Sequence, residues 1–135
     1  MKQYIYIGKK HWQEMQDHVE RYAPMEACGL LAGKHDHVEK VLLVRNQAQS
    51  PVRFVMDPRE QLRAFDWIES SGLDLLGIFH SHPAGPATAS ITDIAEAAYE
   101  VVHIIWSRND EGHWRARGFW IEKGRATEVE LQIIE

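Results

Sequence analysis

Two kinds of spacing between apolar residues divide the chain into expected helices and strands. Apolar side chains at three- and four-residue steps lie on one face of a helix, whereas alternating or β-branched runs are typical of strands. The first spacing predicts helices over Lys9 to Tyr22, Pro58 to about Ser71, and Ser90 to Tyr99. The second predicts strands over Lys2 to Ile7, Cys28 to Ala32, Val38 to Val44, Arg53 to Met56, Leu73 to His82, Val101 to Trp106, Trp114 to Ile121, and Thr127 to Ile134. We therefore expect a mixed sheet with three helices, of α/β or α+β class.

Residues at the ends of these runs indicate where some elements begin and end. Asp57 before Pro58 has the form of an N-cap followed by a first-turn proline, and Gly72 supplies the stop of that helix. Its inward residues are expected to be Leu62, Phe65, Trp67 and Ile68. The helix from Ser90 is expected because apolar residues repeat at Ile91, Ile94, Ala95 and Ala98.

Length and composition narrow the class of protein. A chain of 135 residues buries enough surface for one hydrophobic core, so a single domain over residues 1–135 is expected. One cysteine, Cys28, excludes an internal disulfide and cysteine-rich zinc sites, so a metal would be bound mainly by nitrogen and oxygen. The net charge of −5 without a basic face argues against nucleic-acid binding. No run approaches the roughly 18 apolar residues of a membrane span, and no signal-peptide pattern begins the chain, which predicts a cytoplasmic protein.

The segment from His80 to Asp93 carries the strongest chemical signal. Residues two apart on a strand point to the same face, so His80 and His82 place two imidazoles side by side. Zinc accepts imidazole nitrogen and carboxylate oxygen, and hydrolytic sites keep three protein ligands, which makes Asp93 the candidate third ligand. The alternatives are a structural histidine pair and a capping box in which Ser90 and Asp93 only stabilise a helix start.

Glu26 is the candidate base for such a site. Metal-assisted hydrolysis needs a group that takes a proton from water, and Glu26 stands between Pro24 and Gly29 where packing does not require a charge. The alternative interpretation is a solvated carboxylate where the first helix ends.

Together these residues resemble the motif of the JAMM (MPN+) zinc metalloproteases. The matching string is His80-Ser81-His82-Pro83, six residues, Ser90, two residues and Asp93, preceded by Glu26 in Glu26-Ala27-Cys28-Gly29-Leu30-Leu31. The segment Arg53 to Pro58 is similar to one common in the short prokaryotic members. The resemblance implies a three-layer fold of sheet and flanking helices, related to cytidine deaminases, with zinc bound by His80, His82 and Asp93.

The resemblance also implies a reaction and two catalytic side chains. Glu26 would be the general base and then the proton donor to the leaving amine, while Ser90 would donate a hydrogen bond to the developing oxyanion. The reaction would be hydrolysis of an amide or isopeptide bond. Ala89 departs from the proline expected there in many relatives, without touching a proposed ligand.

Chain length favours one branch of that family. Members that cut ubiquitin chains carry insertions that grip ubiquitin, and the single helix from Asp93 to Val101 leaves no room for the second of them. The chain therefore resembles the stand-alone prokaryotic branch, some of which release amino acids or peptides from the C-terminal Gly-Gly of ubiquitin-like sulfur-carrier proteins. The alternatives are a binding module that recognises such tails without cutting them, and a small-molecule amidohydrolase.

Other reactive or aromatic side chains are interpreted as structural. Cys28 lies in an apolar run and is expected to be a buried, inert thiol. His35 and His37 form a second pair, but in a polar turn where solvation is expected. The five tryptophans are expected in the core or at an interface, and an exposed aromatic face on the last strands would allow a homodimer.

Overall fold

Seven strands and three helices make up the computed structural model, which describes residues 1–135. In chain order they are β1 (Tyr4–Gly8), α1 (Lys9–Tyr22), β2 (Cys28–Lys34), β3 (His37–Val44), α2 (Pro58–Ser70), β4 (Asp74–His82), α3 (Ile91–Glu96), β5 (Val102–Arg108), β6 (Trp114–Glu122) and β7 (Arg125–Ile134). The expected mixed α/β class with three helices is confirmed. None of these helices is both long and apolar enough to cross a lipid bilayer.

One closed sheet contains all seven strands, in the order β1-β3-β2-β4-β5-β6-β7. β2 lies antiparallel between β3 and β4, whereas β4 and β5 are parallel neighbours. β1 closes the sheet by pairing along β7 and by meeting β3 at Tyr6 and His37. Since parallel neighbours need a crossover, the chain leaves β4 at His82, passes through α3, and returns to begin β5. This crossover carries Ser90 and Asp93 back to the strand that bears the histidines.

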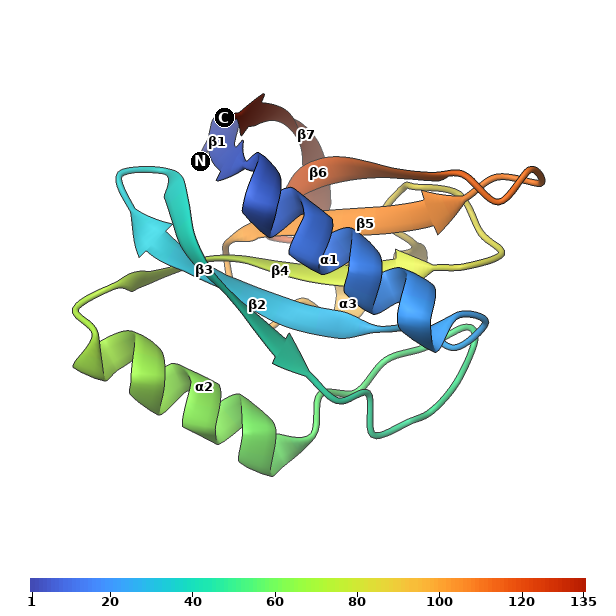
Figure 1. Cartoon of the computed structure of the whole chain (residues 1–135), viewed down its shortest axis with the longest axis horizontal. Helices are drawn as coiled ribbons and strands as arrows, with labels where there is room; N and C mark the ends of the chain where they lie inside the picture. Colours follow the sequence, from blue (N-terminus) through green and yellow to red (C-terminus); the bar gives the residue numbers. More distant parts are fainter.

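Helices cover both sides of the central strands (Figure 1). Because side chains alternate along a strand, Leu31 and Phe79 pack in the cluster that includes Met15 of α1. Leu30 and Ile78 point the other way and pack in the cluster with Ala64 of α2. His80 follows Ile78 by two residues and so lies on the same side of β4.

Two local expectations were wrong, and a third was right only in part. Arg53 to Met56 forms no strand, only an isolated bridge between Asn46 and Met56, because no neighbouring strand is available along its length. The third helix ends at Glu96 rather than Tyr99, since Ala97 takes an extended conformation.

The inward face of α2 was predicted only in part: Ile68 is buried and Phe65 packs against the core, but Leu62 and Trp67 point outward. Ala64 and Ile68 are its buried residues, while Leu62 is 62% and Trp67 40% exposed. Among the helices and strands, α2 packs mainly against β3 and β4, and such one-sided contact buries a narrow stripe. Leu62 precedes Ala64 by two residues, about 200° around the helix, and therefore points away from the sheet.

Candidate metal centre

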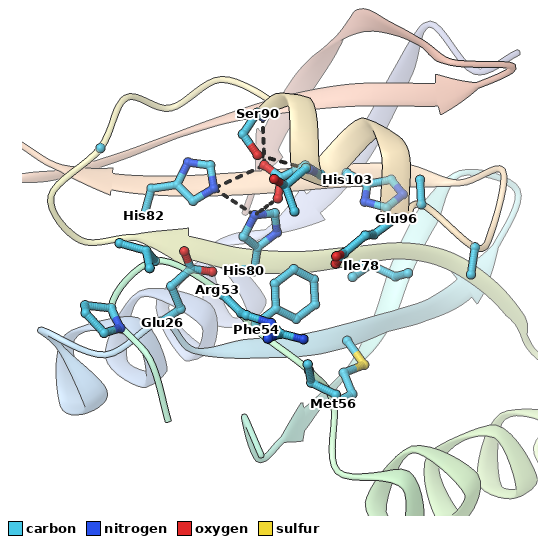
Figure 2. A pocket seen from close by; sticks show the side chains of 18 of the residues that line it. Glu26, Arg53, Phe54, Met56, Ile78, His80, His82, Ser90, Glu96 and His103 are labelled. Atoms are coloured by element: carbon cyan, nitrogen blue, oxygen red, sulfur yellow. Dashed lines mark hydrogen bonds and ion pairs between the residues drawn. The ribbon is translucent and has the colours of Figure 1, made fainter. Parts of the chain in front are cut away.

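Two histidines and one aspartate converge at the end of β4 (Figure 2). The Nε2 atoms of His80 and His82 are 3.0 Å apart. One carboxylate oxygen of Asp93 lies 3.2 Å from Nε2 of His80, and the other lies 3.1 Å from Nε2 of His82. The expected grouping of these three side chains is therefore present in the fold.

The spacing of these atoms fits a tetrahedral zinc site. Ligand atoms at 2.0–2.1 Å from zinc are separated from one another by about 3.3–3.4 Å along the edges of a tetrahedron. The two Nε2 atoms are 3.0 Å apart, and each lies 3.2 or 3.1 Å from a different oxygen of the Asp93 carboxylate, so these separations are close to that value with one of the two oxygens as the third ligand atom. Nδ1 of His82 lies 2.9 Å from the carbonyl oxygen of Pro86, which favours the tautomer that leaves Nε2 free for a metal.

Glu26 lies beside the two histidines, although it comes from a different part of the chain. Its carboxylate and the two imidazoles have ligand atoms within 4.8 Å of one another. The residue is only 4% exposed, so it is not the solvated carboxylate of the alternative interpretation. Its backbone N–H donates to the carbonyl of Ser50, at 2.8 Å, which fixes the segment that leads into β2.

The two carboxylates of the site have opposite pKa shifts. Burial raises the pKa of Glu26 to about 7, with His82 opposing the shift and Asp93 adding to it. Burial alone would raise the pKa of Asp93, but hydrogen bonds with His80 and His82 outweigh it and hold that pKa well below its usual range. A carboxylate that stays ionised suits a ligand, and one with a pKa near neutrality suits proton transfer. The electrostatics thus separate the two acids into different chemical roles.

The histidines also differ from each other. Burial is the main cause that lowers the pKa of His80, whose side chain is completely inaccessible. Burial alone would likewise lower the pKa of His82, but its bonds with Asp93 and Pro86 raise it. A neutral His80 offers a lone pair to a metal without first losing a proton.

Ser90 and Asp93 form the capping box that was one of the two interpretations of their spacing. The backbone N–H of Asp93 donates to Oγ of Ser90 at 3.0 Å, and the N–H of Ser90 donates to the Asp93 carboxylate at 2.9 Å. The two interpretations are compatible, because the cap fixes the carboxylate that faces the histidines. Since Oγ acts as the acceptor, its own hydrogen is free to be donated elsewhere.

An open cavity of about 490 Å³ surrounds this group. Glu26, His80, His82, Ser90 and Asp93 all line it. The site is therefore accessible to a substrate, while its individual donor atoms are held by the strands and the capped helix.

Comparison with known proteins gives the family. The family described as prokaryotic homologs of the JAB domain matches residues 8–120. The chain belongs to this family. The resemblance inferred from the motif is thereby confirmed, as is its assignment to the prokaryotic branch.

Three curated relatives share most of the JAB-domain chain. A desampylase of Pyrococcus furiosus is 39% identical over 81% of this chain and 76% of its own. A probable TtuB-protein conjugate cleaving protease of Thermus thermophilus is 36% identical over 96% of this chain and 83% of its own. A CysO-cysteine peptidase of Mycobacterium tuberculosis H37Rv is 32% identical over 90% of this chain and 85% of its own. These relatives confirm the prediction of an enzyme, a hydrolase of JAMM type.

A solved structure shares the fold of this chain. The solution structure of protein DSY2949 from Desulfitobacterium hafniense has a TM-score of 0.86 and 39% sequence identity, over 97% of this chain and 93% of that one. The fold shared with DSY2949 therefore includes nearly every element described above.

Four site residues of this JAB-domain chain were not found by sequence reasoning. The ring of Phe54 stacks on His80, and the amide of Asn46 donates to the carbonyls of Glu26 and Arg53. Oγ of Ser81 accepts from the N–H of Ala27, and the buried His103 lines the cavity with Nε2 unpaired. Ser81 stood in the matching motif string without a role, and the likeness of the segment Arg53 to Pro58 to prokaryotic members hinted at Phe54.

Apart from the exposed Trp67, most residues set aside as structural lie where they were expected. Cys28 is fully buried, and burial raises the pKa of its thiol to about 12, with Glu26 and Glu60 adding to the shift. His35 is exposed in the turn between β2 and β3, and His37 is exposed at the first position of β3 rather than in the turn. Trp106 is completely buried in the main core, and Trp12, Trp114 and Trp120 pack against it.

Proposed function

We propose that this chain is a zinc-dependent hydrolase of the amide or isopeptide bond at the C-terminal Gly-Gly of a ubiquitin-like or sulfur-carrier protein. The observation that carries the proposal is the 3.0–3.2 Å spacing among His80, His82 and Asp93, beside the buried Glu26. The substrate class is supported by relatives named for cleaving TtuB-protein conjugates and for a CysO-cysteine peptidase activity.

In this proposal each side chain has a separate task. His80, His82 and Asp93 hold zinc, which supplies Lewis-acid activation of water and of the scissile carbonyl. Glu26 accepts a proton from the attacking water and later gives a proton to the departing amine. Ser90 donates its free hydroxyl hydrogen to the oxygen that becomes negatively charged.

The pKa of Glu26 suits this sequence of proton transfers. A carboxyl group with an ordinary pKa near 4.3 is a weak base at pH 7, and one with a pKa near the working pH both accepts and returns a proton. Burial provides that shift here. Asn46 and Ser50 hold the backbone of Glu26, so the carboxylate is presented to the cavity by a fixed segment.

The test separates metal binding from turnover. Carrier proteins with C-terminal amino-acid, peptide or lysine-linked adducts are incubated with the enzyme, with and without a chelator, and their intact masses are measured. Glu26→Gln should retain stoichiometric zinc and lose at least about a hundredfold in rate, in line with the typical contribution of a general base. Asp93→Ala, in contrast, should lose both zinc and turnover. Glu39→Gln removes an exposed carboxylate on β3 and serves as the matched control.

Two results would contradict the proposal. An unchanged rate for Glu26→Gln would remove the assigned base. No mass loss with any adduct, despite bound zinc, would favour a protein that binds such tails without cutting them.

Predictions about the protein as a whole, namely its domain organisation, fold relationship, location and oligomeric state, also belong to this proposal. We propose one domain over residues 1–135, which is supported by the pairing of β1 with β7 near the two chain ends. A three-layer arrangement related to cytidine deaminases is supported by helices on both sides of β4. A cytoplasmic location without nucleic-acid or membrane contact stays a prediction. A homodimer also stays a prediction, and it is supported by the exposed side chains of Tyr4, Ile133 and Ile134. A monomeric mass in light scattering would contradict it.

A further inference from the structure

Two charged side chains in the cavity have no part in the proposed chemistry. Arg53 is the only lysine or arginine that lines it, and Glu96 is its only carboxylate besides Glu26 and Asp93. Neither side chain takes part in an ion pair. The cavity therefore offers a free cation and a free anion next to the candidate metal centre.

The two charges lie on different walls. Arg53 comes directly before Phe54, whose ring stacks on His80, and Glu96 ends α3, which carries Asp93. Figure 2 shows Arg53 and Phe54 on one side of the pocket, and Glu96 and His103 on the other. A ligand beside His80 would thus meet positive charge along one wall and negative charge along the opposite wall.

Apolar side chains line the cavity as well. Phe54, Met56, Ile78 and Tyr99 line it together with the two charges. A Gly-Gly tail has no side chains to fill such space. Under the proposed function, the room beside His80 is therefore available to the group that leaves with the amine.

We propose that Arg53 binds the free α-carboxylate of an amino-acid leaving group, so that the enzyme releases single amino acids from a carrier tail. This inference rests on the proposed function and narrows its substrate. A guanidinium group binds a carboxylate through two parallel hydrogen bonds, which a lysine ammonium cannot reproduce. Glu96 would repel a carboxylate placed on its own wall and so fix the orientation of the leaving group.

The chemistry of the leaving group explains why such a contact is selective. Hydrolysis breaks the bond between the glycine carbonyl carbon and the amine nitrogen; water supplies the hydroxyl to the carbon and a proton to the nitrogen. In an amino acid linked through its α-amine, the carboxylate carbon is two bonds from that nitrogen. A protein lysine linked through its side chain has a neutral backbone amide instead, several methylenes away. Arg53 would therefore favour the first substrate over the second.

The test measures binding apart from turnover. The probes are acetyl-Gly-Gly-alanine and its carboxamide, titrated by calorimetry into the full-length Glu26→Gln protein, with and without zinc. We expect the acid to bind about tenfold to a hundredfold more tightly than the amide, the range for a hydrogen bond between charged groups. Arg53→Gln should abolish this preference, and Arg53→Lys should restore only part of it.

A matched control keeps the result specific. Arg63→Gln removes the same charge from an exposed position on α2 outside the cavity, and should leave the preference unchanged. The substitution at Arg53 spares its backbone carbonyl, which accepts the bond from Asn46.

The outcomes distinguish the inference from the function on which it rests. An acid preference that survives in Arg53→Gln, equal binding of acid and amide, or no binding of either probe would overturn the assignment of Arg53. Failure of the wild-type enzyme to cleave any carrier adduct would instead overturn the proposed function, whatever the probes do.

Discussion

The ring of Phe54 lies stacked on the imidazole of His80, with ring centroids 4.4 Å apart and planes inclined by 25°. Phe54 belongs to a loop without regular structure, whereas His80 is a fully buried residue of β4. The stack therefore connects the position of a proposed metal ligand to a loop that lines the substrate cavity.

Removal of this ring should weaken metal binding. Aromatic pairs contribute about 0.5–1.5 kcal/mol beyond burial, so Phe54→Ala is expected to lower zinc affinity about twofold to tenfold. Competition with a chromophoric chelator measures this change. Phe54→Tyr keeps the stack and should bind zinc as the wild type does, and equal affinity in Phe54→Ala would show that the ring does not support His80.

Asn46 is expected to be essential for the stability of the site. Its amide donates to the carbonyls of Glu26 and Arg53, and its oxygen accepts from the N–H groups of Ala48 and Val55. Asn46→Ala leaves these partners unpaired in a buried region, so we expect a loss of about 2–4 kcal/mol in the free energy of unfolding. Urea denaturation measures it. Gln47→Ala, at an exposed neighbouring position, should change stability by less than about 0.5 kcal/mol.

His18 should make the fold sensitive to mild acid. Burial lowers the pKa of His18 below its usual 6.5, although backbone hydrogen bonds with Cys28 and Val44 oppose the shift. As the pH falls below about 6.5, the unfolded chain takes up a proton that the folded His18 resists, so folding stability decreases with a slope of at most about 1.4 kcal/mol per pH unit.

The measurement compares two proteins over the same pH range. Urea denaturation of the wild type and of His18→Gln is followed between pH 5 and 7.5. Glutamine can still donate to the carbonyl of Cys28, the bond that Nε2 of His18 makes at 3.0 Å, but it does not titrate. The variant should lose stability less steeply on acidification, and an identical slope would contradict the role given to His18.

Cys28 should be unreactive in the folded protein. With a pKa raised to about 12, roughly one thiol in ten thousand is ionised at pH 8, and the side chain is inaccessible. Iodoacetamide at pH 8 should leave the intact mass unchanged, and should add one adduct in denaturing urea. Rapid alkylation of the native protein would show that β2 opens readily next to Glu26.

Sequence alone predicted much of the fold because the signals are local. The helix over Lys9–Tyr22 was predicted at its observed ends, since apolar spacing and Pro24 depend only on neighbouring residues. The outward positions of Leu62 and Trp67 could not be predicted, because they depend on which strands α2 packs against.

The candidate site divides in the same way. His80 and His82 lie two residues apart on one strand, and Ser90 and Asp93 lie within one helical turn, so their local geometry follows from the backbone period alone. Glu26 reaches the histidines only because Cys28 pairs with His80 across β2 and β4. Phe54 and Arg53 enter the cavity only because Asn46 binds their loop. Short-range periodicity depends on neighbouring residues and can therefore be read from the sequence. The contacts of Glu26, Phe54 and Arg53 instead arise from strand pairing and loop packing between distant segments. Only the tertiary structure decides these contacts.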